Sequence, residues 1–256
     1  MITIHEKDVS LLAHQFDDFD GVIINTAELP NSTTLFTAEL TTLLASLKPF
    51  KKRLVWLTLP IDKAAWVGIV AGFGFVFHNC LEQEVTMILR LAPDAYAPFV
   101  PTHSIGSGAL VLNDKNQILL VKEIKQPGLG YKLPGGHIEL NENISQAILR
   151  EVVEETGVVT EFDSLVGFAI KHNYRFSKSN IYFVCKLNVV SEKIDIQDTD
   201  EIEDAKWMDV ESYLSDDSSS VFNRKMVATL LTTEGFRLTE LEYNSGPNAK
   251  SEVYFS

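Results

Sequence analysis

The chain has 256 residues, of which 45% are hydrophobic and 22% charged, enough apolar material for a folded core, so disordered and fibrous proteins are excluded. Acidic residues (35) outnumber Lys and Arg (22), giving a net charge of −13. Because nucleic acids and anionic lipids are bound by clustered basic side chains, we expect neither as a partner. The first twenty residues lack the basic region of a signal peptide, and the longest uncharged apolar stretch, 64–77, is shorter than the about 18 residues of a membrane span. These features predict a cytoplasmic protein.

The first part of the chain reads as a small α/β domain, residues 1–97. Apolar spacing predicts helices and strands in alternation, and Phe73, Phe75 and Phe77 alternate with other residues as if on one face of a strand. The expected elements are helices over 34–47 and 62–70 and strands over 53–59, 72–78 and 85–91. Three prolines in the segment 92–101 disfavour helix and remove backbone donors, which indicates a linker at 98–101.

The remainder reads as a second domain, 102–215, followed by a tail, 216–256, that forms a helix and a strand on it. Turn-forming residues 113–116 predict a hairpin between the first two strands, and Gly157 predicts the end of the first helix. The expected elements are strands over 107–112, 117–122, 165–171, 180–187, 205–210 and 253–255 and helices over 144–156 and 221–232.

The helix at 144–156 has an unusual charge pattern. Asn143 can cap it, with Gln146 completing a capping box. Glu151, Glu154 and Glu155 fall within an arc of about 100°, which we place opposite the apolar face. Four residues form that apolar face: Ile148, Leu149, Val152 and Val153.

This acidic arc is unfavourable for a helix alone. Like charges at i,i+4 cost about 0.2–0.5 kcal/mol each, and glutamates in the last turns oppose the helix dipole by about 0.3–1 kcal/mol each. The alternative is a solvated acidic face. The neighbouring Arg150 and the preceding Pro-Gly-Gly turn favour instead a site for Mg²⁺ or Mn²⁺, hard cations that bind carboxylates and phosphates.

The segment 136–158 resembles the Nudix box, Gly-x5-Glu-x7-Arg-Glu-U-x-Glu-Glu-x-Gly-U, where U is aliphatic. Each fixed position is filled: Gly136, Glu142, Arg150, Glu151, Val152, Glu154, Glu155, Gly157 and Val158. The resemblance implies a Nudix hydrolase, an enzyme that cuts the phosphoanhydride of a nucleoside diphosphate linked to another moiety with the help of Mg²⁺ or Mn²⁺. It also implies an α/β (α+β) fold class, with a C-terminal α/β/α sandwich and a mixed sheet.

The resemblance also implies roles for individual residues. Glu151 and Glu155 correspond to metal ligands, Glu154 to a further ligand, and the Gly135 carbonyl to another. Arg150 is expected to orient the cluster by pairing with Glu142.

Nudix enzymes often draw a general base from a late loop before a Trp-bearing strand, here 200–208. We predict Glu201 for this role, with Glu203 or a glutamate of the box as the alternatives; a solvated acidic loop stays open as well.

Further segments resemble one Nudix branch, which contains plant ADP-ribose/NADH pyrophosphatases and the vertebrate fibroblast-growth-factor antisense product. They are 102–103, 106–111, 132–136, 179–185, 201–202, 205–208 and, in the first domain, 72–78. The branch implies a small-molecule nucleotide substrate (ADP-ribose or NADH), a homodimer, and an acetyltransferase-like fold for the first domain. The stripe of Phe73, Phe75 and Phe77 also favours the homodimer. Acetyl transfer itself is not expected, because Gly72 and Gly74 have no basic residue close by in the sequence.

Residues outside the box are expected to select the nucleotide. The polar and aromatic loop 171–176 predicts substrate binding by Tyr174, Arg175 and Phe176, and we add Lys132 from the segment before the box. Two other functions stay open: hydrolysis of non-standard nucleoside triphosphates, and ligand sensing without catalysis.

Overall fold

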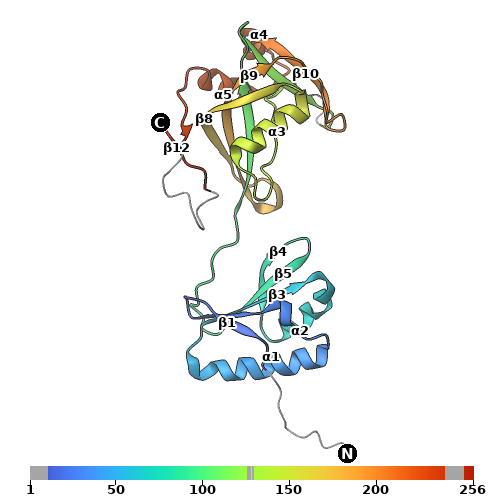
Figure 1. Cartoon of the computed structure of the whole chain (residues 1–256), viewed down its shortest axis with the longest axis vertical. Coiled ribbons are helices and arrows are strands. Elements are labelled where there is room, and N and C mark those ends of the chain that lie inside the picture. The colour runs from blue at the N-terminus through green and yellow to red at the C-terminus, as the bar shows by residue number, and fades with distance from the viewer. Residues whose placement is uncertain (1–10, 126–127, 129, 240–250) are drawn as a thin grey trace, which may run out of the picture. The chain divides into compact units, whose positions relative to one another are not determined.

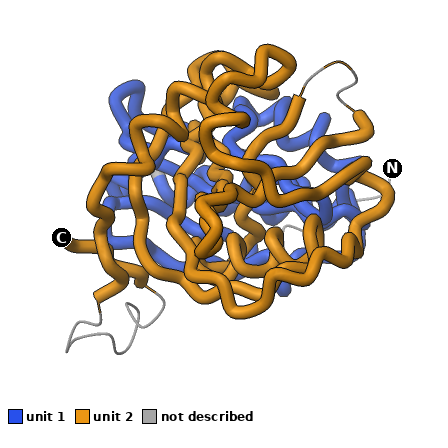
Figure 2. The backbone as a smooth tube through the Cα atoms, turned by 90° about the horizontal axis from the view of Figure 1, so that it is seen from above, with its two compact units in different colours: residues 1–100 blue, residues 101–256 orange. Residues whose placement is uncertain are grey.

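The computed structural model describes residues 11–125, 128, 130–239 and 251–256. The chain divides into two compact units, residues 1–100 and 101–256, coloured separately in Figure 2. Each has its own hydrophobic core. Among the described residues, no helix is both long and apolar enough to cross a membrane.

Unit 1 is a sheet with a long helix packed on it (Figure 1). The described strands form one sheet in the order β1-β2-β3-β5-β4, in which only β2 and β3 pair in parallel. Its strands are β1 (His14–Phe16), β2 (Gly21–Ile24), β3 (Leu54–Pro60), β4 (Val76–Cys80) and β5 (Glu84–Arg90). Its helices are α1 (Thr33–Leu47) and α2 (Val67–Gly72), with short 3-10 turns at Thr26–Glu28, Lys48–Phe50 and Ile61–Trp66.

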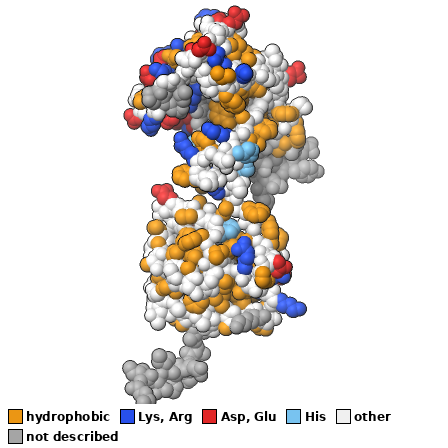
Figure 3. Space-filling model, turned by 180° about the vertical axis from the view of Figure 1, so that it is seen from behind, with side chains coloured by type: hydrophobic (Ala, Val, Ile, Leu, Met, Phe, Trp, Pro, Cys, Tyr) orange, Lys and Arg blue, Asp and Glu red, His pale blue; other side chains and the backbone are white. Residues whose placement is uncertain are grey.

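The predicted phenylalanine stripe of unit 1 is wrong. Gly72 ends helix α2 and Gly74 has a φ of +91°, so the chain turns there and β4 begins only at Val76. Phe75 is buried in the core of unit 1 whereas Phe77 is 70% exposed, so these rings do not share a face. On the face drawn in Figure 3, hydrophobic side chains of unit 1 are scattered rather than gathered in one stripe.

Unit 2 holds two main sheets. The first has the order β6-β9-β8, with β6 and β9 parallel and β8 and β9 antiparallel; the second pairs β7 with β10 in antiparallel fashion. The strands are β6 (His103–Val111), β7 (Gln117–Glu123), β8 (Val159–Lys171), β9 (Ser179–Ser191), β10 (Ile202–Asp209), β11 (Arg237–Leu238) and β12 (Tyr254–Phe255). The helices are α3 (Ile144–Thr156), α4 (Val210–Ser215) and α5 (Val221–Leu230), with a 3-10 turn at Arg175–Ser177.

Helices cover both faces of the sheet β6-β9-β8, as the alternation of its side chains requires. Ala109 and Cys185 face α3, where they contact the cluster of Ile148 and Val152. The neighbouring Leu110 and Val184 belong instead to the cluster that includes Val227 of α5. The predicted mixed α/β fold with a mixed sheet is therefore confirmed; the acetyltransferase-like character of unit 1 stays a prediction.

The hairpin expected at 113–116 is only partly correct. The turn is present, since the Asn113 side chain accepts from the Lys115 amide and the Asn113 amide donates to the Gln117 carbonyl, both over 3.0 Å. The strands on either side pair only at Leu112 and Ile118 and then enter different sheets. The hydrophobic pattern cannot predict that the two strands enter different sheets, because both strands are buried.

Candidate active site

Helix α3, which holds most of the box, has the predicted bounds. It begins at Ile144 after Asn143, and the expected capping box is present, with the Gln146 side chain accepting from the Asn143 amide at 3.4 Å. It ends at Gly157, whose φ of +74° is the left-handed conformation that favours glycine. The cap residues thus fix which residues fall in the last two turns, where the glutamates lie.

The segment before the helix crosses from one sheet to the other. Lys132 exchanges backbone hydrogen bonds with Val121 of β7, and the carbonyl oxygens of Pro134 and Gly136 then accept from β6. Gly135 has a φ of +141°, and a Cβ built on it would collide with the Ser107 carbonyl oxygen. A glycine is therefore required for the backbone to lie this close to β6.

Glu155 is the buried carboxylate of the site. Glu155 follows Val152 by one helical turn and Ile148 by two, so its side chain lies at the edge of the apolar face of α3. The prediction that Glu155 lies opposite that face was therefore wrong. Glu155 is 4% exposed, and its Oε2 accepts a hydrogen bond of 2.6 Å from the Gly135 amide. Burial raises the pKa of Glu155 to about 8. The positive charge of Lys132 lowers this pKa but does not cancel the effect of burial.

Glu151 lies one turn before Glu155 and against Gly136. A Cβ built on Gly136 would come within 2.5 Å of Glu151 Oε1, so the carboxylate occupies the space that a side chain would otherwise fill. Burial raises the pKa of Glu151, and the guanidinium of Arg150 lowers it; Glu154 and Glu201 raise it further. The box glycines and the helix thus bring two partly desolvated carboxylates to the same place.

Arg150 joins the glutamates into one network. Its Nε and Nη2 donate to Glu142 at 2.8 and 2.9 Å, which is the pairing expected from the sequence. Its Nη1 donates to both Glu151 and Glu154 at 3.0 Å, and Nη2 also reaches the His137 carbonyl at 3.3 Å. Hydrogen bonding from Arg150 holds the pKa of Glu142 below its ordinary value, so this pair stays charged.

Within the described part of the chain, no three acidic, His or Cys side chains converge as a formed metal site. Glu151 and Glu154 point to Arg150 instead, which relieves the repulsion between their charges. The residues nonetheless fit a divalent cation. The donors are all carboxylate or carbonyl oxygens, the missing Cβ of Gly136 lets the Glu151 carboxylate lie against the backbone, and burial leaves Glu155 with a raised pKa that a cation would lower.

The two late-loop candidates for the general base have different surroundings. Glu201 precedes β10, its carbonyl accepts from the Ile124 amide at 2.8 Å, and its charge raises the pKa of both Glu151 and Glu155. Glu203 sits at a bulge of β10 and is paired with Lys122 at 2.9 Å. The charge of Glu201 thus acts on both cluster glutamates, whereas Glu203 is paired with Lys122, and Glu201 stays the predicted base.

The predicted substrate-binding residues fall in two places. Lys132 forms an ion pair with Glu123 and lies close enough to Glu155 to lower its pKa. Tyr174, Arg175 and Phe176 lie between β8 and β9, where the Arg175 guanidinium is 5.6 Å from the Tyr174 ring centre and Phe176 is 92% exposed. Lys132 therefore lies beside the glutamates, and the other three form an exposed loop at the end of the sheet.

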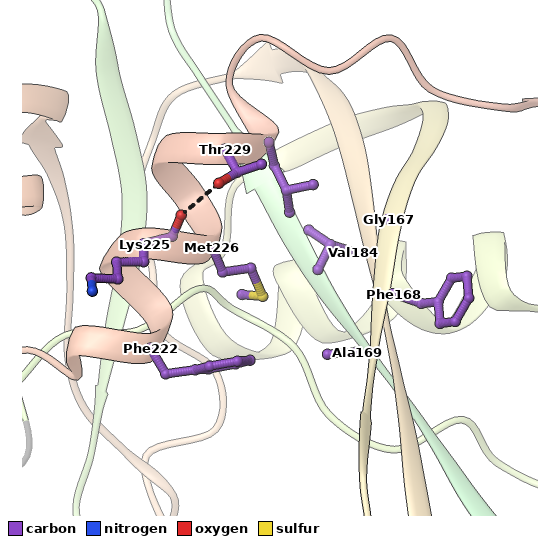
Figure 4. Close-up of a pocket in the computed structure, with 9 residues that line it drawn as sticks. Gly167, Phe168, Ala169, Val184, Phe222, Lys225, Met226 and Thr229 are labelled. Atoms are coloured by element: carbon purple, nitrogen blue, oxygen red, sulfur yellow. Dashed lines mark hydrogen bonds between the residues drawn. The ribbon is translucent and has the colours of Figure 1, made fainter.

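A cavity of about 390 Å³ lies between α5 and the sheet (Figure 4). Phe222 and Met226 of α5 point toward the sheet over Ala169 and Val184. Ala169 of β8 lies opposite Tyr182 of β9, and Tyr182 in turn lies opposite Gly106 of β6. Gly106 forms a bridge with His137, which follows the box glycines. The cavity is thus at a similar level along the strands as the site but on the α5 face of the sheet, opposite α3, and its lining is mainly apolar.

Two acidic residues at the site were missed by sequence reasoning. Glu123 is the partner of Lys132, and the carboxylate of Glu252 accepts from the first amides of α3. Glu123 could have been found from the sequence if segment 131–137 had been paired with β7, because Glu123 is two residues after Val121, the backbone partner of Lys132. No local signal identifies Glu252, because it is 108 residues from Ile144.

Comparison with known proteins gives matches over both units. A NUDIX domain model matches residues 102–230, and a model described as a Nudix hydrolase domain matches residues 12–91. Nudix hydrolase 8 of Arabidopsis thaliana is 36% identical over 81% of this chain and 58% of its own length. Nudix hydrolase 2 of the same plant is 34% identical over 82% of this chain and 76% of its own. The human nucleoside diphosphate-linked moiety X motif 6 is 27% identical over 95% of this chain and 80% of its own.

A solved structure, the MutT NUDIX hydrolase from Burkholderia pseudomallei, matches with 23% identity and a TM-score of 0.43, covering 49% of this chain and 96% of that one. The family model and the relatives establish the assignment: this chain belongs to the Nudix hydrolase family. The predicted branch with plant and vertebrate members is confirmed as well. The chain spans less than two thirds of Nudix hydrolase 8 and more than two thirds of the other two relatives.

Proposed function

We propose that the chain hydrolyses the pyrophosphate bond of a nucleoside diphosphate linked to another moiety. ADP-ribose or NADH is the proposed substrate, giving AMP and a phosphorylated product, and Mg²⁺ or Mn²⁺ is the proposed cofactor. The observation that carries the proposal is the pair of desolvated carboxylates, Glu151 and Glu155, held against Gly135 and Gly136 beside Arg150. A role in stability alone does not account for this pair, because burying carboxylates beside each other is costly.

Each residue has a distinct part in this proposal. Glu151, Glu155 and the Gly135 carbonyl would hold the cation, with Glu154 as a further ligand, while Arg150 keeps these side chains in place through Glu142. When bound, the cation supplies charge neutralisation at the pyrophosphate and lowers the pKa of water. Glu201 is proposed to take the proton from the attacking water.

Substrate binding is proposed for Lys132 and for the loop with Tyr174, Arg175 and Phe176. Lys132 is paired with Glu123 and lowers the pKa of Glu155, so its positive charge lies beside the cluster, where it is suited to a phosphate. The loop offers an aromatic ring and a guanidinium, groups that stack on nucleobases and bind phosphates. ADP-ribose and NADH themselves rest on the resemblance to the branch.

A substrate screen tests the proposal. ADP-ribose, NADH, CoA, diadenosine polyphosphates and nucleoside triphosphates are incubated with Mg²⁺ or Mn²⁺, and products are separated by chromatography. Glu151→Gln serves as the inactive control and is expected to lower kcat by orders of magnitude without unfolding the protein. Turnover of triphosphates alone would replace the substrate class, and turnover of none, with binding retained, would indicate a ligand sensor.

We make three further proposals. The chain is proposed to act in the cytoplasm, to form a homodimer, and to have an acetyltransferase-like unit 1 without acetyl transfer. The homodimer rests on the branch alone, since the phenylalanine stripe that favoured it does not exist in the structure. Light scattering that gives a mass near 28.6 kDa would reject it.

A further inference from the structure

The beginning of α3 is bound by a carboxylate from a distant part of the chain. Glu252 Oε2 accepts from the Ile144 amide at 2.7 Å, and Glu252 Oε1 accepts from the hydroxyl and the amide of Ser145 at 3.0 and 3.4 Å. The first amides of a helix have no partner within it, so these contacts satisfy donors that would otherwise need water. Glu252 therefore adds a negative charge at the positive end of the helix dipole.

Helix α3 has few other stabilising groups at this end. Its own capping box includes a long hydrogen bond, 3.4 Å from the Asn143 amide to Gln146, and its first turn contains no acidic residue. Its glutamates are in the last turns, where the dipole disfavours them. Glu252 thus supplies the favourable charge that the helix sequence lacks.

Glu252 is itself held in place. The hydroxyl of Tyr254 donates to Glu252 Oε1 at 2.8 Å, and the Tyr254 ring packs against Phe162 and the cluster beneath α3. Strand β12 pairs with β11, which follows Phe236, and Phe236 bridges to Leu165 of β8. The carboxylate that meets α3 is therefore attached to the same sheet that supports the site.

We propose that Glu252 is a positioning residue for the acidic cluster. By binding the amides of Ile144 and Ser145, it fixes α3 along its axis and so sets where Glu151 and Glu155 lie against Gly135 and Gly136. The link to catalysis rests on the proposed function, whereas the effect on the helix rests on the contacts alone.

The test compares Glu252→Ala, Glu252→Gln and a matched control, Asp163→Asn, in the full chain. Asp163 accepts from Arg237 at 3.0 Å in an ion pair whose arginine is largely exposed, so its replacement is expected to leave the backbone pairing of β11 with β12 intact, and it removes no contact to α3. Hydrogen exchange is measured for peptides covering 144–149 and 150–156 without metal. Mn²⁺ binding is measured by the spin-resonance signal of the free ion, also without substrate.

In Glu252→Ala, exchange is expected to become about tenfold faster in both peptides, and half-saturation with Mn²⁺ to need about five- to tenfold more ion. Glu252→Gln, which keeps an acceptor oxygen, is expected to restore part of both effects, and Asp163→Asn to show neither. Faster exchange confined to 144–149 with unchanged Mn²⁺ binding would overturn the proposal and leave Glu252 as a local cap. If the unaltered chain binds no Mn²⁺, the proposed function fails, while exchange in 150–156 still decides the positioning role.

Discussion

At the scale of single residues, burial raises the pKa of the glutamates at the site, and neighbouring positive charges lower it. Arg150 supplies one positive group to three glutamates, and its bidentate contact is made with Glu142, outside the cluster itself. Among the described residues, the Gly135 amide and the Lys132 charge offset the burial of Glu155. Glu155 is therefore the residue whose ionisation is most sensitive to a bound cation.

Without a divalent cation, Glu155 is expected to make folding stability fall as the pH rises from about 5 to about 8. The native pKa of about 8 exceeds the unfolded value of 4.5, so in this window the native state keeps a proton that the unfolded state has lost. The slope is at most about 1.4 kcal/mol per pH unit. Urea unfolding in EDTA at several pH values, for the unaltered chain and Glu155→Gln, gives the difference that isolates this group; a difference independent of pH would contradict the prediction.

The two candidate bases are expected to respond differently to removal of charge. Glu201→Gln should lower kcat about 10²- to 10⁴-fold if it is the general base, the role that its charge effect on Glu151 and Glu155 supports. Glu203→Gln removes an ion pair with Lys122 that is largely exposed and worth about 0–1 kcal/mol, so activity should stay within about threefold. Steady-state kinetics with saturating substrate and Mn²⁺ measures both, and a larger loss in Glu203→Gln would reverse the assignment.

The box could be predicted from sequence because its signals are local. Spacing along the chain identifies Glu142, Arg150 and the three glutamates, and the resemblance to the Nudix box implied the pairing of Arg150 with Glu142. The burial of Glu155 was not predicted. The three glutamates span an arc of about 100° on the helix, and the sequence alone does not show which edge of that arc lies against the sheet. That edge is set by the passage of Gly135 across β6, a tertiary contact.

At the scale of elements, the ends of α3 were predictable and the surroundings of the helix were not. Asn143 and Gly157 mark the ends through conformations that few residues adopt. The strands 107–112 and 117–122 were placed correctly, but their separation into two sheets depends on segment 131–137, which lies between them. Similarly, alternating residues at 72–78 suggested a strand, whereas Gly74, with its positive φ, forms a turn after α2.

Gly157→Ala is expected to destabilise the chain by about 2 kcal/mol or more. The residue has a φ of +74°, which disfavours a side chain, and the new Cβ would collide with the backbone of Asp195. Gly72→Ala is the matched control: it also lies at the end of a helix, but nothing is within 4 Å of the new Cβ, and its effect should be within about 1 kcal/mol of zero. Urea midpoints compare the two, and equal losses would show that the glycine conformation at 157 is not limiting.

At the scale of the whole molecule, the two units have separate hydrophobic cores. The main cluster of unit 1 runs from Leu12 to Met87, and the clusters of unit 2 begin at Ala109. All residues proposed for binding and hydrolysis lie in unit 2, within 132–201. Unit 1 therefore contributes no side chain to the proposed chemistry, although a Nudix hydrolase model matches its sequence.

Separate cores predict separate unfolding transitions. Leu40 of α1 is fully buried in unit 1, and Leu40→Ala should destabilise that unit by about 2–5 kcal/mol while leaving the transition of unit 2 in place. Leu110→Ala, on β6 of unit 2, is the reciprocal variant and should shift only the other transition. Calorimetry resolves the two, and Mn²⁺ should raise only the transition that Leu110→Ala lowers, because a ligand stabilises the unit that binds it. If Leu40→Ala shifts both transitions together, the units unfold as one cooperative body, and activity would then depend on the core of unit 1.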